Sequence, residues 1–194
     1  AGLSAGCATP IGVRIADPLE VQRYLTRSAL TDERPSDFSL IQLRRYDLLQ
    51  AYRDETDSAL AKLHAAALAE GFPPQALFAL AELSFLRARE TGLQTGYAAA
   101  VIYSYALLFP GKGHTPLDEL DPRERIAADL YNRALTSAFR RTKQGILVPN
   151  AGGEVPLPFG HLSVTSAPNM LQMSGSELYD LQPVAELEVW GLRN

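Results

Sequence analysis

Hydrophobic and polar residues recur between positions 17 and 144 with the spacing of amphipathic helices. Apolar residues recur at intervals of three or four, as at Phe38 and Ile41 or Leu48 and Tyr52. Glycines and prolines interrupt the pattern at regular places. The pattern therefore predicts six helices, over residues 18–30, 37–53, 57–70, 74–91, 95–109 and 122–143.

Residues that favour helix starts and stops support these boundaries. Asp17 and Asp121 each precede a proline, the arrangement of a side-chain cap followed by the first helical residue. Ser36, Thr56 and Thr95 are expected to cap three further helices. The sequence therefore indicates helices with defined, short connections.

The composition changes after Gly145, where glycine and proline become frequent. Short apolar or alternating runs follow, which are typical of half-buried strands. They cover residues 145–148, 155–159, 161–165 and 187–190. We therefore divide the chain into a start and spacer (1–16), a helical domain (17–144) and a β-rich connector (145–194).

The expected fold class is mainly α, an antiparallel helical stack with a small C-terminal β-rich segment. Helix starts expected near 36 and 74, and near 56 and 95, are 38 and 39 residues apart. Tetratricopeptide repeats have a period of about 34 residues, so the stack is expected to resemble them with longer turns. A plain helical bundle is the alternative. Ala99 and Ala100 are small residues placed where two helices can approach closely.

Charge and composition exclude several classes of function. The net charge is −4 and the isoelectric point about 5.4, so there is no basic field for nucleic acid. The single cysteine excludes an internal disulfide framework and a cysteine-rich zinc site. The longest apolar stretch, residues 97–109, is shorter than the roughly 20 residues that span a bilayer.

That single cysteine, Cys7, ends the sequence Leu3-Ser-Ala-Gly-Cys, which resembles a bacterial lipobox. In a lipobox the thiol carries a diacylglycerol, and two or three acyl chains anchor a protein stably. We therefore expect Cys7 to be the lipidation site, membrane lipid to be its partner, and the cell envelope to be the location. Residues 1–6 are then the remainder of a signal peptide. The alternative is an incidental cysteine behind a flexible arm.

Residues 2–6 also satisfy G-x-S-x-G, the nucleophile elbow of α/β-hydrolases. An elbow requires a strand before it and a helix after it. One residue precedes the motif and Pro10 follows it closely, so neither element fits and Ser4 is not expected to be a nucleophile.

The sequence offers few other candidate catalytic or metal-binding residues. His64, His114 and His161 lie on an expected helix, in a loop and at a strand start, without the spacing of metal ligands. We expect no catalytic residue, no metal and no cofactor in this chain. Tyr97 and Tyr105 are two helical turns apart; they are expected to pack in the core or to line a groove for a peptide or partner helix.

Several phrases, in this order, resemble the N-terminal region of bacterial lipoproteins that carry a downstream α/β-hydrolase domain. They are residues 76–86 (ALFALAELSFL), 98–106 (AAAVIYSYA), 128–135 (ADLYNRAL), 157–160 (LPFG) and 190–194 (WGLRN). The resemblance implies a lipobox, a helical region and a strand-rich connector ahead of the hydrolase. It also implies that the catalytic serine, acid and histidine belong to a domain absent from this chain.

Three hypotheses follow. The first is a membrane-tethered, non-catalytic helical region that holds or presents a hydrolase domain. The second is a self-contained helical-repeat lipoprotein that binds other proteins as an envelope scaffold. The third is an esterase that uses Ser4 or Ser176 of this chain.

Overall fold

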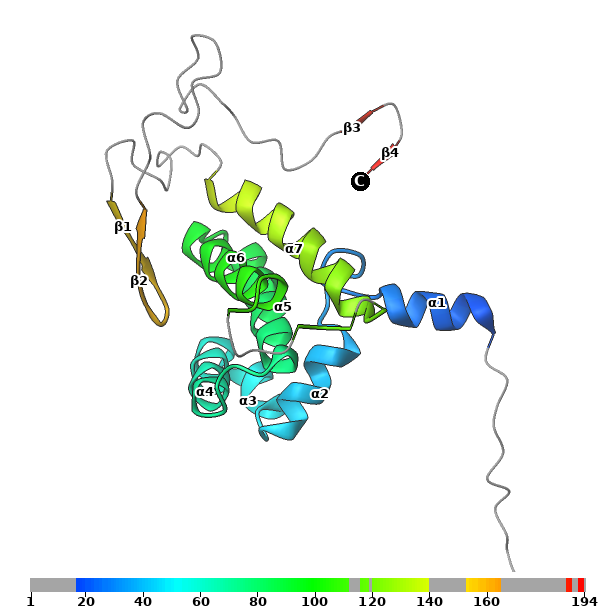
Figure 1. Ribbon diagram of the computed structural model, residues 1–194, viewed down its shortest axis with the longest axis horizontal. Coiled ribbons are helices and arrows are strands. Elements are labelled where there is room, and N and C mark those ends of the chain that lie inside the picture. Colours follow the sequence, from blue (N-terminus) through cyan, green and yellow to red (C-terminus); the bar gives the residue numbers. More distant parts are fainter. Residues whose placement is uncertain are drawn as a thin grey trace, which may run out of the picture.

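The computed structural model describes residues 17–111, 116–118, 120–139, 153–164, 188–189 and 192–193. This part of the chain is mainly helical, with a small antiparallel hairpin beside the helices (Figure 1). The expected mainly α class, with a small β-rich segment toward the C-terminus, is confirmed for the described residues.

Seven helices and four short strands occur in the described residues. The helices are α1 (Pro18–Thr26), α2 (Asp37–Arg45), α3 (Leu49–Asp54), α4 (Thr56–Ala69), α5 (Pro74–Thr91), α6 (Gln94–Leu108) and α7 (Pro122–Phe139). The strands are β1 (Gly153–Leu157), β2 (Gly160–Val164), β3 (Glu188–Val189) and β4 (Leu192–Arg193). β1 pairs antiparallel with β2, and β3 with β4.

Helix α5 is the centre of the fold. It contacts α2, α4, α6 and α7, and most of its residues are buried. A helix that is apolar nearly all round is stable only inside a core, which explains the alanine- and leucine-rich sequence of α5. In a repeat array each unit contacts only its neighbours. The tetratricopeptide-like arrangement is therefore not confirmed.

Three of the expected helix caps are present. The side chain of Asp17 accepts a hydrogen bond from the Leu19 N–H, and that of Asp121 accepts one from the Arg123 N–H, both at 2.9 Å. Ser36 receives the Ser39 N–H at 3.4 Å. Each cap satisfies a backbone donor that the first turn of a helix leaves unpaired.

Two expected caps are wrong. Thr56 lies inside the first turn of α4, and its hydroxyl donates to the Tyr52 carbonyl of the preceding helix. Thr95 lies inside α6, which begins at Gln94 after Leu93. A threonine hydroxyl in the first turn of a helix can donate to a preceding backbone carbonyl instead of capping the helix. The expectation based on residue type therefore placed the starts of α4 and α6 one residue too late.

Two expected helices are shorter than the sequence suggested. The helix expected over 37–53 breaks between Arg45 and Leu49, where Asp47 has a φ of 53°. Aspartate tolerates this left-handed conformation better than most residues. The helix expected over 18–30 ends at Thr26, because the Ala29 N–H is bonded to a side chain of α5 instead of continuing the helix.

That side chain is Glu82, a carboxylate with no exposed surface. Its Oε1 accepts the Ala29 N–H at 2.9 Å, and its Oε2 accepts the Ser36 N–H at 2.9 Å. The hydroxyls of Ser36 and Ser39 also donate to Oε2, at 2.6 and 2.5 Å. Four donors from the α1–α2 connection and α2 thus surround one buried carboxyl group, which ties this segment to α5.

Helices α5 and α6 approach each other closely at Gly96. A Cβ at that position would lie 2.9 Å from the Cβ of Ala88. Ala98, Ala99 and Ala100 follow in α6 and are fully buried, as expected for small residues between helices. A side chain at position 96 would therefore collide with α5.

We therefore expect Ala100→Leu to lower the free energy of unfolding by about 1–3 kcal/mol, because extra methyl groups must displace packed neighbours. Thermal or denaturant unfolding measures the change. Ala65→Leu is the matched control, since Ala65 is an exposed alanine of α4. Equal stability of the two variants would contradict the packing of α6 described here.

The β1–β2 hairpin matches the runs expected at 155–159 and 161–165, with its turn at residues 158 and 159. β3 lies within the run expected at 187–190. The run at 145–148 and the end of the sixth expected helix lie outside the described residues.

Candidate functional site

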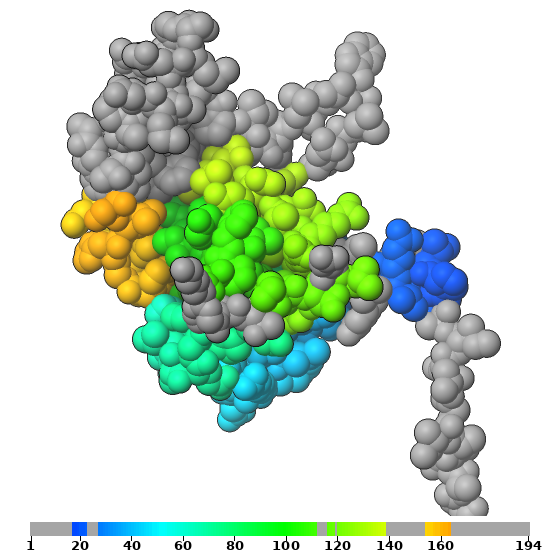
Figure 2. All heavy atoms as spheres, in the orientation of Figure 1, coloured from blue at the N-terminus to red at the C-terminus, as the bar shows by residue number. Residues whose placement is uncertain are grey.

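The turn of the β1–β2 hairpin lies against α4 and α6, as the orange segment in Figure 2 shows. Alternation along β1 places Val155 inward, and this side chain is 1% exposed. At the turn, the Phe159 ring stacks on the His64 imidazole, with centroids 4.9 Å apart and planes at 12°. The hairpin is therefore attached to the helices through apolar and ring contacts.

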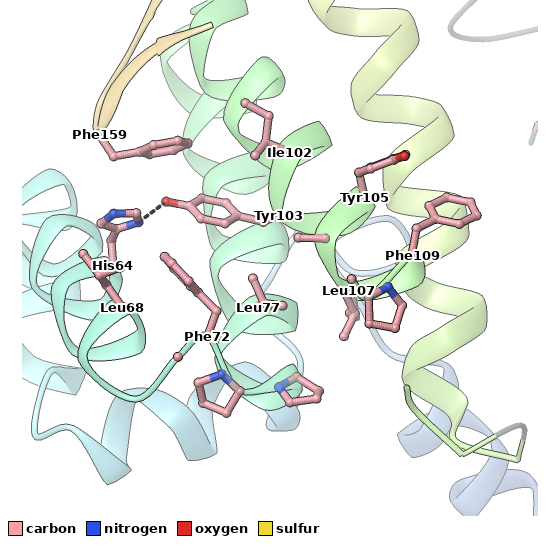
Figure 3. Close-up of a pocket in the computed structure, with 16 residues that line it drawn as sticks. His64, Leu68, Phe72, Leu77, Ile102, Tyr103, Tyr105, Leu107, Phe109 and Phe159 are labelled. Atoms are coloured by element: carbon pink, nitrogen blue, oxygen red, sulfur yellow. Dashed lines mark hydrogen bonds between the residues drawn. The ribbon is translucent and has the colours of Figure 1, made fainter. Parts of the chain in front are cut away.

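Three rings from three elements meet at this point (Figure 3). His64 comes from α4, Tyr103 from α6 and Phe159 from the hairpin turn. The Tyr103 and Phe159 centroids are 5.0 Å apart, and Phe72 lies 5.3 Å from His64 on another side. These rings form the densest aromatic contact among the described residues.

His64 and Tyr103 are joined by a hydrogen bond of 2.8 Å between Nδ1 and the phenol oxygen. Burial lowers the pKa of His64 and raises the pKa of Tyr103, so both are neutral near pH 7. We assign the Tyr103 hydroxyl as the donor, because it has no other acceptor among the described residues. With that assignment His64 carries its proton on Nε2, for which the described residues supply no acceptor.

A cavity of about 690 Å³ lies on one side of the three rings. It runs between α4, the start of α5 and the end of α6, and no charged side chain is among its described lining residues. Tyr105 and Phe109 line it and are 53% and 59% exposed. Its walls are His64, Leu68, Gly71, Phe72, Pro73, Pro74, Leu77, Ile102, Tyr103, Tyr105, Ala106, Leu107, Phe109, Pro110, Gly111 and Phe159.

A second cavity, of about 410 Å³, lies on the other side of the same rings. It is bounded by α4, α5, α6 and the hairpin turn, and shares His64, Tyr103 and Phe159 with the larger cavity. Its described lining residues include charged and hydroxyl-bearing side chains, which apart from Tyr103 and Tyr105 are missing from the described lining of the larger cavity. Asp57 and Arg87 form a two-bond ion pair at its edge, at 2.8 and 2.6 Å, which lowers the pKa of Asp57.

The structure separates the residues that the sequence singled out. Tyr97 is buried with its ring edge-on to Phe85, whereas Tyr105 is exposed, so they do not share a groove. His161 is exposed on β2. The candidate lipidation site Cys7 lies outside the described residues, as do Ser4, Ser176 and His114.

Sequence reasoning placed His64 on a helix but gave it no partner. It included Phe159 in an expected strand and in the phrase at 157–160, but not among the candidate site residues. These residues meet only through the fold, and neither has a local sequence signal. The described residues contain no group of three or more side chains able to hold a metal ion. None of the described helices has the length and apolar character needed to cross a membrane.

No known protein family, curated protein or solved structure matches the chain.

Proposed function

We propose that the chain is the membrane-tethered, non-catalytic helical region of a hydrolase-type lipoprotein. In this proposal an acylated Cys7 anchors it in the bacterial cell envelope, and the connector leads from the helices to the hydrolase domain. The attachment of the β1–β2 hairpin is the observation that most supports it. A connector that begins at a fixed point on a rigid body can hold a following domain in one orientation.

The strength of that attachment is compatible with such a role. Complete burial of a valine side chain stabilises by about 1.5–3 kcal/mol, and Val155 is 1% exposed. The Phe159 ring adds contacts with His64 and Tyr103. The hairpin is thus fixed by a few side chains, and single substitutions test its role.

The anchor is tested by metabolic labelling of the expressed protein with an alkyne-bearing fatty acid, followed by membrane fractionation. The proposal expects label and membrane association for the wild type and for the control Thr9→Ala, and neither for Cys7→Ser. Label that persists in Cys7→Ser would contradict the assignment of the anchor.

The hydrolase is tested by the coding sequence that follows Asn194. The proposal expects the reading frame to continue into a strand, a G-x-S-x-G motif and a helix. In that longer protein, Phe159→Ala is expected to speed limited proteolysis between the two parts while ester turnover persists. A stop codon directly after Asn194 would exclude this function.

A second candidate function is a protein-binding scaffold of the envelope. It is favoured by the exposed pair Tyr105 and Phe109, whose ring centroids are 4.9 Å apart. Exposed aromatic side chains are enriched at protein interfaces. Cross-linking in cells is expected to capture a partner that Phe109→Asp loses and that Ile41→Asp, at an exposed position on α2, retains. Retention by both variants would exclude this surface.

A further inference from the structure

The two cavities beside Phe159 have the size and chemistry of one small-molecule site. Ligand sites are concave, mostly apolar, roughly 300–1,000 Å³ in volume, and carry a few placed polar groups. The cavities measure about 690 and 410 Å³ and share the walls His64, Tyr103 and Phe159. Because these three side chains line both cavities, a ligand that displaces Phe159 can extend into both.

The larger cavity is suited to an alkyl chain. Its described walls are aliphatic, aromatic, proline and glycine apart from the His64–Tyr103 pair. A charged or strongly polar ligand group would lose its hydration there without a compensating partner, which is costly. The occupant of the larger cavity is therefore apolar along its length.

The smaller cavity presents hydrogen-bonding groups that the described residues leave unused. Ser84 is 7% exposed and lines this cavity, yet its hydroxyl bonds to none of the residues that the structure describes. Nearly buried hydroxyl groups in proteins usually have a partner. Together with the Nε2–H of His64, Ser84 provides donors for a carbonyl or hydroxyl oxygen.

The same cavity does not offer a free positive charge to an anion. Arg87, the only cation among its described lining residues, binds the carboxylates of Asp57 and Glu90. A ligand carboxylate here would face Asp57 without an unpaired cation. The polar end of the occupant is therefore uncharged.

We propose that this pair of cavities binds a neutral long-chain acyl ester, with the alkyl chain in the larger cavity and the ester near Ser84 and His64 in the smaller one. Binding requires the hairpin turn to shift so that Phe159 no longer divides the two spaces. This site is independent of the anchor at Cys7 and of any hydrolase domain.

The test is isothermal titration of the full chain, carrying Cys7→Ser, with 1-monopalmitoylglycerol and with palmitic acid below their aggregation limits. We expect saturable one-to-one binding of the ester. The acid is expected to bind at least tenfold more weakly, because its carboxylate would face Asp57 without an unpaired cation. Shortening the alkyl chain from sixteen to eight carbons is expected to weaken binding stepwise.

Matched variants locate the site. Ala106→Trp fills the larger cavity and is expected to abolish binding, whereas Ala65→Trp, at an exposed position, preserves it. Ser84→Ala is expected to weaken ester binding about tenfold, and Ser163→Ala, on the exposed face of β2, leaves it unchanged. Circular dichroism verifies that each variant is folded.

The outcomes that overturn the proposal are distinct. Absence of saturable ester binding would disprove the ligand site. Tighter binding of the acid than of the ester would disprove the claim that the ligand is uncharged. Binding that survives in folded Ala106→Trp and Ser84→Ala places the ligand elsewhere. None of these results bears on acylation of Cys7 or on a following hydrolase domain.

Discussion

Replacing Glu82 with alanine is expected to lower the free energy of unfolding by about 2–6 kcal/mol. The change removes the acceptor of two buried backbone N–H groups, those of Ala29 and Ser36. Each buried donor left without a partner costs about 1–3 kcal/mol. The hydroxyls of Ser36 and Ser39 can rotate toward other acceptors, so they add less.

Glu82→Gln isolates the hydrogen-bond pattern from side-chain volume. An amide has only one oxygen, so its NH₂ group must face either the Ala29 or the Ser36 N–H, and a loss of about 1–3 kcal/mol is expected. Glu90→Gln is the control on the same helix. Glu90 is exposed and paired with Arg87, and such surface pairs contribute about 0–1 kcal/mol. Equal urea-unfolding midpoints for the wild type, Glu82→Gln and Glu90→Gln would contradict the role of Glu82.

The same carboxyl group predicts a pH dependence. Burial raises the pKa of Glu82 above its ordinary value of 4.5, although the four hydrogen bonds partly oppose this shift. The folded protein therefore holds the proton more tightly than the unfolded chain does. The stability of the wild type relative to Glu82→Gln is expected to be constant below pH 4.5 and to fall as pH rises through the folded pKa. A relative stability that rises with pH would contradict the shift.

Phe78→Ala is expected to cost about 3–5 kcal/mol, the usual range for removing a buried aromatic ring. Phe78 has no exposed surface, and the Phe38 ring meets it edge-on, with centroids 5.9 Å apart. Arg123, at the start of α7, lies over the other ring of this pair at 5.6 Å. Loss of Phe78 therefore removes packing shared by α5, α2 and α7.

Phe109→Ala is the matched control, because Phe109 is the same residue type at 59% exposure. Its loss is expected to change stability by less than about 0.5 kcal/mol, as is usual for surface positions. Chemical denaturation of the two variants side by side measures the difference. Similar losses in both would mean that Phe78 does not lie in the core described here.

The sequence predicted those parts of the fold that depend on neighbouring residues. Asp17, Ser36 and Asp121 cap helices as expected, and α5 begins at Pro74 and is terminated by Gly92. Short-range signals of this kind act within one helical turn. They did not reveal the break at Asp47, because a helical pattern continues on both sides of it.

Features that depend on distant residues were not predictable in this way. Glu82 is bonded to residues 43 to 53 positions earlier in the chain. Its apolar neighbours in α5 indicate burial, but nothing in the local sequence identifies the donors that it meets. His64 and Tyr103 are 39 positions apart and meet because α4 and α6 both pack against α5. Their contact with Phe159 requires the hairpin to fold back onto the helices. No local pattern contains that information.

The close approach of α5 and α6 at Gly96 also sets which parts of the proposed ligand site can yield. Gly96 and Ala88 both line the smaller cavity, and they already lie at contact distance. This part of the cavity wall resists deformation because α5 and α6 cannot move closer to each other. The opposite wall, formed by the hairpin turn, is held by far fewer side chains. The wall at Gly96 and Ala88 would then determine which ligands fit, and the hairpin turn would determine how fast they enter. Substitutions at the first wall are expected to change equilibrium affinity, and substitutions in the hairpin turn to change the rates of binding and release.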